Sequence, residues 1–209
     1  MIEQKDTMLA FRRAWLLNIG LHIATAHSAE NDCIVTHDVD MQPNEAVDYT
    51  WCERPTLLCA EISCFGGGTP YPTYSGGVVG ATLKDWKHIN GYTNTAYGWG
   101  GENDDLYYRW KANHLDAGMG GAGLRRPSRG RGVCSCGRED DRTLRQKNES
   151  AYREISKKLH CMQQGSDEWK HDGLSNLQYN TVSTSVDKFG SHWIAVSGNK
   201  PVHTQTMPF

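Results

Sequence analysis

The sequence predicts an α/β domain in which a mixed sheet is flanked by helices. Residues 7–27 place apolar side chains three and four positions apart, the spacing of an amphipathic helix. Residues 32–37 are a short run rich in β-branched side chains, which indicates a buried, parallel-type strand. Strand-like and helix-like segments then alternate along the chain. Together these observations favour an α/β fold over an all-helical or all-β one.

The middle of the chain continues this alternation. A second strand is expected over 56–62, and a third element over 71–79. Residues 82–90 have a helical pattern that stops at Gly91, a residue suited to a helix end. A further helix is expected over 104–113, with three apolar side chains on its inner face: Leu106, Tyr107 and Trp110.

The remaining segments are more polar. Residues 117–137 are dominated by Gly, Arg and Ser, which indicates a mobile loop. The charged stretch 138–158 predicts a helix or a hinged loop and helix. An alternating pattern through Val182, Val186 and 193–196 predicts strands at the end of the chain. No internal repeat is present, so residues 1–209 are interpreted as one domain.

Composition narrows the class of protein. The chain has 209 residues, of which 38% are hydrophobic and 22% charged, and its net charge is −2. This balance gives no bulk attraction to nucleic acid, so no nucleic-acid partner is expected. The apolar stretches near residue 1 are far shorter than the ~20 residues that span a bilayer. A membrane contact is therefore expected only through an anchor that this chain does not contain.

The seven cysteines leave the redox compartment open. Because the number is odd, at least one cysteine has no partner within the chain. The spacing of Cys52, Cys59 and Cys64 matches no common zinc motif, since no CxxC pair occurs among them.

Two segments carry residues suited to chemistry. Asp38 and Asp40 follow the strand over 32–37, and two carboxylates at this spacing can reach a hard divalent cation and a ribose or phosphate. An ordinary turn is the alternative for such a pair. The second segment, 97–105, combines glycines beside Trp99 with an acidic cluster that can orient sugar hydroxyls. Its alternative is an acidic helix start.

Several motifs occur in the order found in β-1,4-galactosyltransferases, and the chain resembles that family over essentially its whole length. The motifs are FRRAWLLNIG at 11–20, HDVD at 37–40, PYPTYSGGV at 70–78, INGY at 89–92, GWGGENDD at 98–105 and DGLSNLQY at 172–179. Residues 44–49 and the spacing of Tyr71 and Tyr74 look similar to the xylosylprotein branch, which adds galactose to xylose.

The resemblance implies an inverting, manganese-dependent glycosyltransferase that uses UDP-galactose, with a GT-A fold. Asp40 would bind the metal and Asp38 would approach the nucleotide ribose. Tyr74 would fill the space that an N-acetyl group on the donor sugar would need. The donor pocket would include Tyr71, Gly77 and Trp99, the last on a flap that closes over the substrates.

The resemblance also implies roles in acceptor binding and catalysis, with Glu102 and Asp104 holding the acceptor sugar. Asn103 stands where the family has its general base, and an amide cannot accept the proton at neutral pH. Asp104 is therefore a candidate substitute.

The metal site departs from the family pattern as well. Cys134 and Cys136 stand where the xylosylprotein branch has a His-x-His pair of ligands. If these thiols bound the metal, Zn²⁺ or Co²⁺ would be favoured over Mn²⁺. The alternative is that the cysteines are redox-silent loop residues in a degraded site.

The family places a nucleotide-binding segment before the FRRA motif, and this chain starts almost at that motif. The expectation is an N-terminally truncated fold, the C-terminal part of a catalytic domain from the Golgi lumen. A short relative that binds UDP poorly is the other reading. The expected function is transfer of galactose from UDP-galactose to a terminal xylose or N-acetylglucosamine on a glycan, glycoprotein or proteoglycan. The alternative is a non-catalytic, sugar-binding relative of the same fold.

Overall fold

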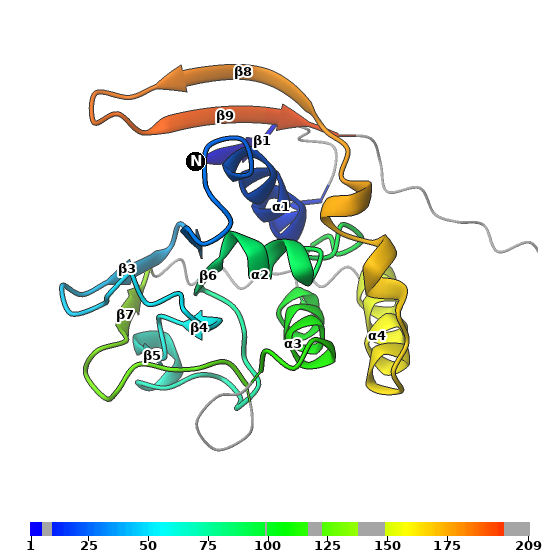
Figure 1. The fold of residues 1–209 in the computed structure, drawn as a ribbon, viewed down its shortest axis with the longest axis horizontal. Helices are drawn as coiled ribbons and strands as arrows, with labels where there is room; N and C mark the ends of the chain where they lie inside the picture. Colours follow the sequence, from blue (N-terminus) through cyan, green and yellow to red (C-terminus); the bar gives the residue numbers. More distant parts are fainter. Residues whose placement is uncertain (6–9, 99, 117–122, 138–148, 199–209) are drawn as a thin grey trace, which may run out of the picture.

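A computed structural model describes residues 1–5, 10–98, 100–116, 123–137 and 149–198. Within these residues the chain forms three small three-stranded sheets and four α-helices, together with short 3-10 turns (Figure 1). The expected combination of mixed strands and helices is confirmed.

The central sheet has the strand order β2 (Cys33–His37), β6 (Val78–Thr82) and β4 (Thr56–Leu57). Strand β2 was expected to be buried and of parallel type. It is instead antiparallel to β6, lies at an edge of this sheet, and is only partly buried. The correction has a simple cause: β-branched residues favour extended backbone but do not set the direction of the partner strand. The strand nevertheless ends, as expected, just before Asp38.

The second sheet has the order β3 (Met41–Pro43), β7 (Val133–Cys136) and β5 (Glu61–Ile62). The strand expected over 56–62 is thus divided between two sheets. The Leu58 amide still donates to the Val78 carbonyl at 2.9 Å, whereas the Ala60 amide donates to the Gly132 carbonyl at 2.9 Å. The chain leaves β6 and joins the segment before β7 within two residues.

The loop expected over 117–137 is only partly a loop. Residues 117–122 lie outside the described part of the chain. Within residues 123–137, Leu124 and Cys134 are buried at 1% exposure each, and the segment contains β7. The polar composition of this segment did not predict β7. A disulfide between Cys59 and Cys134 holds the segment against the core.

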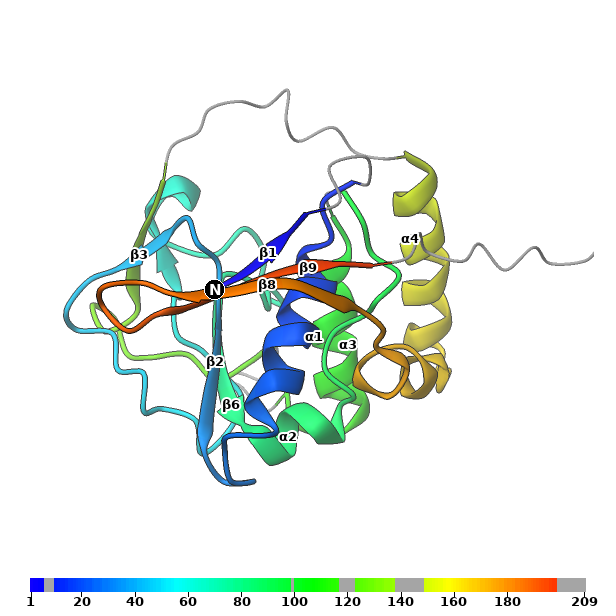
Figure 2. The same cartoon turned by 90° about the horizontal axis from the view of Figure 1, so that it is seen from above.

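The third sheet covers helix α1 (Arg13–Ala24), in order β1 (Ile2–Gln4), β9 (His192–Ser197) and β8 (Asn180–Val186). The strands expected near the end of the chain are β8 and β9, which pair in antiparallel fashion, and β9 also pairs in parallel with β1. Figure 2 shows this sheet crossing over α1. The two layers share a small apolar cluster: Trp15, Leu16, Ile19 and Val196.

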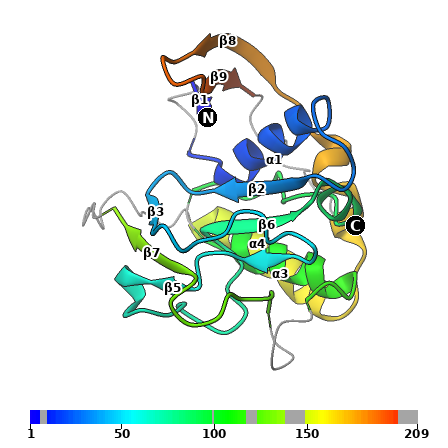
Figure 3. The same ribbon diagram turned by 60° about the vertical axis from the view of Figure 1, so that its left-hand side comes forward.

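Helices α2 (Leu83–His88) and α3 (Glu102–Ala112) pack with the central sheet in one apolar core, to which α1 also contributes. Helix α2 begins at Thr82, whose hydroxyl accepts from the Asp85 amide at 3.1 Å, and ends before Gly91 at φ 63°. Helix α3 buries Leu106, Tyr107 and Trp110, as expected. Helix α4 (Glu149–Gln163) lies beside α3 (Figure 3). Three 3-10 turns complete the fold: Ser63–Phe65, Glu168–His171 and Leu174–Asn176.

The helices in the described part of the chain are too short and too polar to cross a lipid bilayer.

Candidate functional site

One large cleft, of about 1730 Å³, contains most of the residues singled out from the sequence. Its walls come from a face of α1, from β2 and the turn after it, from the first turn of α3 and from the segment before β6. Asp38, Asp40, Tyr71, Tyr74 and the 102–104 segment all line it, and so does Cys136. Residues far apart in sequence therefore meet around a single hollow large enough for an extended ligand.

Arg13, from the first turn of α1, joins the two acidic segments of the cleft. Its Nε lies 2.6 Å from Asp38 Oδ1, and its Nη1 lies 3.2 Å from Asn103 Oδ1. The same nitrogen is 3.8 Å from Glu102 Oε1. This guanidinium thus connects the end of β2 with the start of α3.

Burial alone would lower the pKa of Arg13, but Asp38, Tyr92 and Glu102 raise it above its ordinary value. The guanidinium is therefore cationic at any pH at which the protein folds, and Asp38 is its carboxylate partner. Arg13 has no role among the sequence-based predictions. Its position on the apolar face of the predicted helix could have indicated a buried charge with an acidic partner.

Asp40 differs from Asp38 in its surroundings. Its side chain is exposed, whereas the Asp38 side chain is 20% exposed and paired with Arg13. The backbone of Asp40 is fixed, because its carbonyl accepts the Gly137 amide at 2.7 Å. The structure thus holds the Asp40 main chain in place and presents its carboxylate at the edge of the cleft.

The donor set suits a hard divalent ion of the Mg²⁺ or Mn²⁺ type. Such ions are commonly held by one or two carboxylates together with the phosphates of the substrate, so a complete protein cage is not required. The described residues contain no group of three or more His, Cys, Asp or Glu side chains that could hold an ion by themselves. Asp40 fits the role of the protein carboxylate in that arrangement.

The expectation that Cys134 and Cys136 bind the metal is wrong in this structure. Cys134 is bonded to Cys59, and Cys136 is bonded to Cys64. A metal-binding cysteine must be a thiolate, and a disulfide sulfur is not one. The preference for Zn²⁺ or Co²⁺ depended on these two thiols as ligands, so it no longer applies. Sequence could not show this, because disulfide pairing depends on how the strands come together.

Tyr71 and Tyr74 pack edge-to-face with ring centroids 5.6 Å apart. Burial raises the pKa of Tyr74 to about 12. Burial also raises the pKa of Tyr71, and the Asp104 carboxylate, which accepts a hydrogen bond from its hydroxyl, raises it further. Both phenols are therefore neutral donors at physiological pH, and Tyr71 orients Asp104 within the cleft.

Glycines allow these elements to come close together. Gly77 adopts φ 77°, and its carbonyl accepts the Asp38 amide at 3.0 Å. A Cβ on Gly76 would lie 2.5 Å from Asn103 Oδ1, so the Asn103 side chain could not keep its present position beside a larger residue. Gly98, Gly100 and Gly101 all have positive φ, which suits the expected hinge. Trp99 itself lies outside the described residues.

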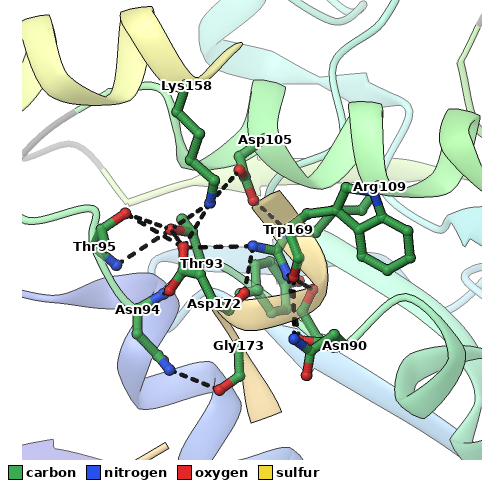
Figure 4. Close-up of polar contacts among 12 residues, drawn as sticks. Asn90, Thr93, Asn94, Thr95, Asp105, Arg109, Lys158, Trp169, Asp172 and Gly173 are labelled. Carbon is green, nitrogen blue, oxygen red and sulfur yellow. Dashed lines mark hydrogen bonds and ion pairs between the residues drawn. The ribbon is translucent and has the colours of Figure 1, made fainter. Parts of the chain in front are cut away.

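A second group of charges, which sequence reasoning also missed, lies behind the cleft. Asp105, Arg109, Lys158 and Asp172 form a buried network that joins α3, α4 and the segment before the third 3-10 turn (Figure 4). Within it the Asn94 side-chain amide donates to the Gly173 carbonyl at 2.7 Å. The motifs at 98–105 and 172–179 meet in this network.

The chain is similar in sequence to known galactosyltransferases. Residues 57–133 match a family model described as the N-terminal domain of galactosyltransferase. Human β-1,4-galactosyltransferase 6 is 40% identical over 109 residues, which are 52% of this chain and 28% of that protein. Bovine β-1,4-galactosyltransferase 3 is 28% identical over 193 residues, which are 91% of this chain and 45% of that protein.

A solved structure resembles the whole fold. It is a variant of Drosophila β-1,4-galactosyltransferase 7 in complex with manganese, UDP-Gal and xylobiose. The TM-score is 0.66 at 21% identity, and the match covers 95% of this chain and 79% of that one. A likeness at this identity defines the fold.

The fold is thus the GT-A fold of that solved structure. By sequence, the chain is similar to the β-1,4-galactosyltransferases, the family that its motifs resemble. It spans about half or less of the length of these curated relatives.

Proposed function

We propose that this chain carries the catalytic cleft of a galactosyltransferase that moves galactose from UDP-galactose to a terminal sugar, with inversion. The observation that carries the proposal is the meeting of Asp38, Asp40, Tyr71, Tyr74 and Asp104 around one cleft in a GT-A fold. The acceptor class is a terminal xylose or N-acetylglucosamine. Xylose has the added support of the solved relative that binds xylobiose, whose fold this chain shares.

Different residues of the cleft have different roles in the proposed reaction. Arg13 holds Asp38 toward the nucleotide side of the cleft. Tyr74, 6% exposed, fills space beside Gly77 and so selects a donor sugar without a bulky N-acetyl group. Asp104, oriented by Tyr71, accepts the proton of the attacking acceptor hydroxyl. Glu102 hydrogen-bonds the acceptor sugar.

Asp40 would hold Mn²⁺ together with the diphosphate of the donor. When bound, the ion neutralises the negative charge that develops on the departing UDP. This role agrees with the manganese present in the solved relative, and with the hard oxygen donor that Asp40 supplies.

A non-catalytic, sugar-binding role is the second candidate, and Asn103 favours it. The Asn103 side-chain oxygen accepts a hydrogen bond from Arg13, and an amide is no general base at neutral pH. In this alternative the cleft binds sugar nucleotide or glycan without turnover.

The three disulfides indicate the kind of cellular compartment in which the protein folds. The chain forms Cys33–Cys52, Cys59–Cys134 and Cys64–Cys136, which leaves Cys161 unpaired. Disulfides persist in oxidising compartments and are rare in the cytosol. They support placing the protein in the secretory pathway, and the Golgi lumen is the compartment that this proposal names.

Titration of UDP in the presence and absence of Mn²⁺ tests the proposal directly. For Asp40→Ala we expect the Mn²⁺-dependent part of UDP affinity to fall by about 10–100-fold, the range for losing one charge-assisted contact. Asp40 is exposed, so thermal stability should change little. Glu45→Ala, an exposed carboxylate in a nearby loop, is the matched control.

Unchanged manganese-dependent UDP affinity in Asp40→Ala would contradict the metal assignment. Transfer of galactose from UDP-galactose to a xyloside by the wild-type chain then separates the two candidate functions. Turnover supports the enzyme, whereas sugar binding without turnover supports the alternative.

A further inference from the structure

The buried network behind the cleft begins at Asp105, the residue directly after Asp104. Asp105 is fully buried, and each of its carboxylate oxygens has its own cation. Arg109 Nε lies 2.5 Å from Oδ1, and Lys158 Nζ lies 2.9 Å from Oδ2 (Figure 4). Arg109 belongs to the same helix, α3, but Lys158 belongs to α4. The ion pair between Asp105 and Lys158 therefore connects the two helices at the first turn of α3.

Asp172 completes the network. Its Oδ2 lies 2.5 Å from Lys158 Nζ, and its main-chain carbonyl accepts from Arg109 Nη2 at 2.7 Å. The Lys158 ammonium also donates to Thr93 Oγ1 at 3.1 Å. Two carboxylates and two cations thus balance, and the ammonium of Lys158 has three oxygen partners. Such a charge group has a fixed geometry, because moving any member leaves a buried charge unpaired.

Helix α4 also contacts the glycine turn that precedes α3. A Cβ on Gly101 would lie 2.6 Å from Ile155 Cγ2, so the Ile155 side chain rests on bare backbone there. Ile155 and Lys158 are three residues apart and lie on the same face of α4. One face of α4 therefore holds the start of α3 at two neighbouring points, one apolar and one charged.

We propose that Lys158 is a positioning residue for the transfer reaction, acting through Asp105 on the first turn of α3. Lys158 lies outside the cleft lining, whereas Glu102 and Asp104 are within it. The lysine sets the direction in which these two carboxylates face the acceptor sugar. The inference rests on the function proposed above, and it assigns to α4 a part in acceptor alignment.

The test must separate alignment from stability. Lys158→Met alone leaves two buried carboxylates facing one arginine, and this variant is expected to be destabilised. The double variant Asp105→Asn, Lys158→Met restores the charge balance but not the link between the helices. Lys157→Met, at an exposed neighbouring position of α4, is the matched control.

For the double variant we expect a cooperative melt near that of wild type and UDP affinity in manganese within about twofold. Its kcat for transfer to a xyloside should fall by about 10²-fold, the cost of misplacing a reacting group by about 1 Å. Hydrolysis of UDP-galactose without acceptor should fall much less. Lys157→Met should resemble wild type in every measurement.

Full transfer activity in the double variant would overturn the positioning role, as would a loss of transfer matched by an equal loss of UDP affinity. A wild-type chain that neither binds UDP nor transfers galactose would instead contradict the proposed function, and the role of Lys158 with it.

Discussion

Four consecutive side chains at the start of α3 do not all have the same surroundings. Glu102, Asn103 and Asp104 line the cleft, where Asn103 accepts a hydrogen bond from Arg13, whereas Asp105 is fully buried against Arg109 and Lys158. The cause is helical geometry, which turns each successive side chain by about 100°. A run of acidic residues is therefore not one functional unit, and Asp104 is the cleft carboxylate that accepts a hydrogen bond from Tyr71.

Asp104→Asn tests this at the scale of one residue. The amide keeps the shape of the side chain and can still accept from Tyr71, but it cannot take a proton. We expect kcat for transfer to fall by about 10²–10⁴-fold, with UDP affinity and melting temperature close to wild type. Steady-state kinetics and UDP titration measure the two effects. A variant with wild-type kcat would remove Asp104 from the role of base.

At the scale of elements, the first turn of α3 depends on glycine and on α4. Gly101 has φ 92°, and Ile155 occupies the space where a side chain would project. Gly165, just after α4, has φ 89° with nothing within 4 Å of the corresponding position. The two glycines have nearly the same positive φ, but only Gly101 has a side chain packed against it.

The pair gives a matched comparison. Gly165→Ala should reduce the free energy of unfolding by about 1–2 kcal/mol, the cost of left-handed backbone for a residue with a Cβ. Gly101→Ala should cost more than this and should also lower transfer activity, because Ile155 and α4 must move. Denaturant unfolding of both variants measures the difference. Equal losses of stability would show that α4 does not press on this turn.

At the scale of the whole molecule, the charge network makes folding dependent on pH. Burial alone would raise the pKa of Asp172, but Lys158 and Arg109 hold it below the usual range of a carboxyl group. A carboxyl group with a lowered pKa in the folded state stabilises the protein above its unfolded pKa, about 3.9. That contribution is lost as the pH falls through the lower, folded-state pKa.

We therefore expect stability to fall steeply below about pH 4. Asp172→Asn should be less stable than wild type at neutral pH and should show a weaker loss of stability in the acid range. Urea unfolding between neutral and acid pH checks this. Asp187→Asn, at a surface turn where the pKa is also lowered, is the control and should keep most of the acid dependence. An Asp172→Asn variant with the wild-type pH profile would contradict this assignment.

Much of the fold could be predicted from local patterns, with particular failures. The helices over 82–90 and 104–113 follow from capping and apolar spacing, which are properties of neighbouring residues. The sequence predicts one continuous strand over 56–62, because its residues favour extended backbone throughout. Where the chain changes partners, at Leu58 and Ala60, is set by β6 and by the segment at Gly132. No local pattern contains that information.

The candidate site shows the same division. The motifs located the cleft residues Asp38, Asp40, Tyr71, Tyr74 and Asp104, and the structure brings them together. Arg13 was missed because its partners are 25 and 90 positions away in sequence. Lys158 and Asp172 were missed for the same reason, since charged residues in a polar stretch are usually solvated.

The sequence by itself determined the fold class, the family resemblance and several of the residues that line the cleft, among them Asp38, Asp40 and Tyr74. Only the tertiary structure decided that Cys134 and Cys136 are disulfide-bonded, that Arg13 pairs with Asp38, and that Lys158 joins α4 to α3. The physical reason is the separation along the chain over which each kind of interaction acts. Propensity, capping and turn chemistry act between neighbours along the chain, whereas disulfides and buried ion pairs depend on which distant segments the packed core brings within bonding distance.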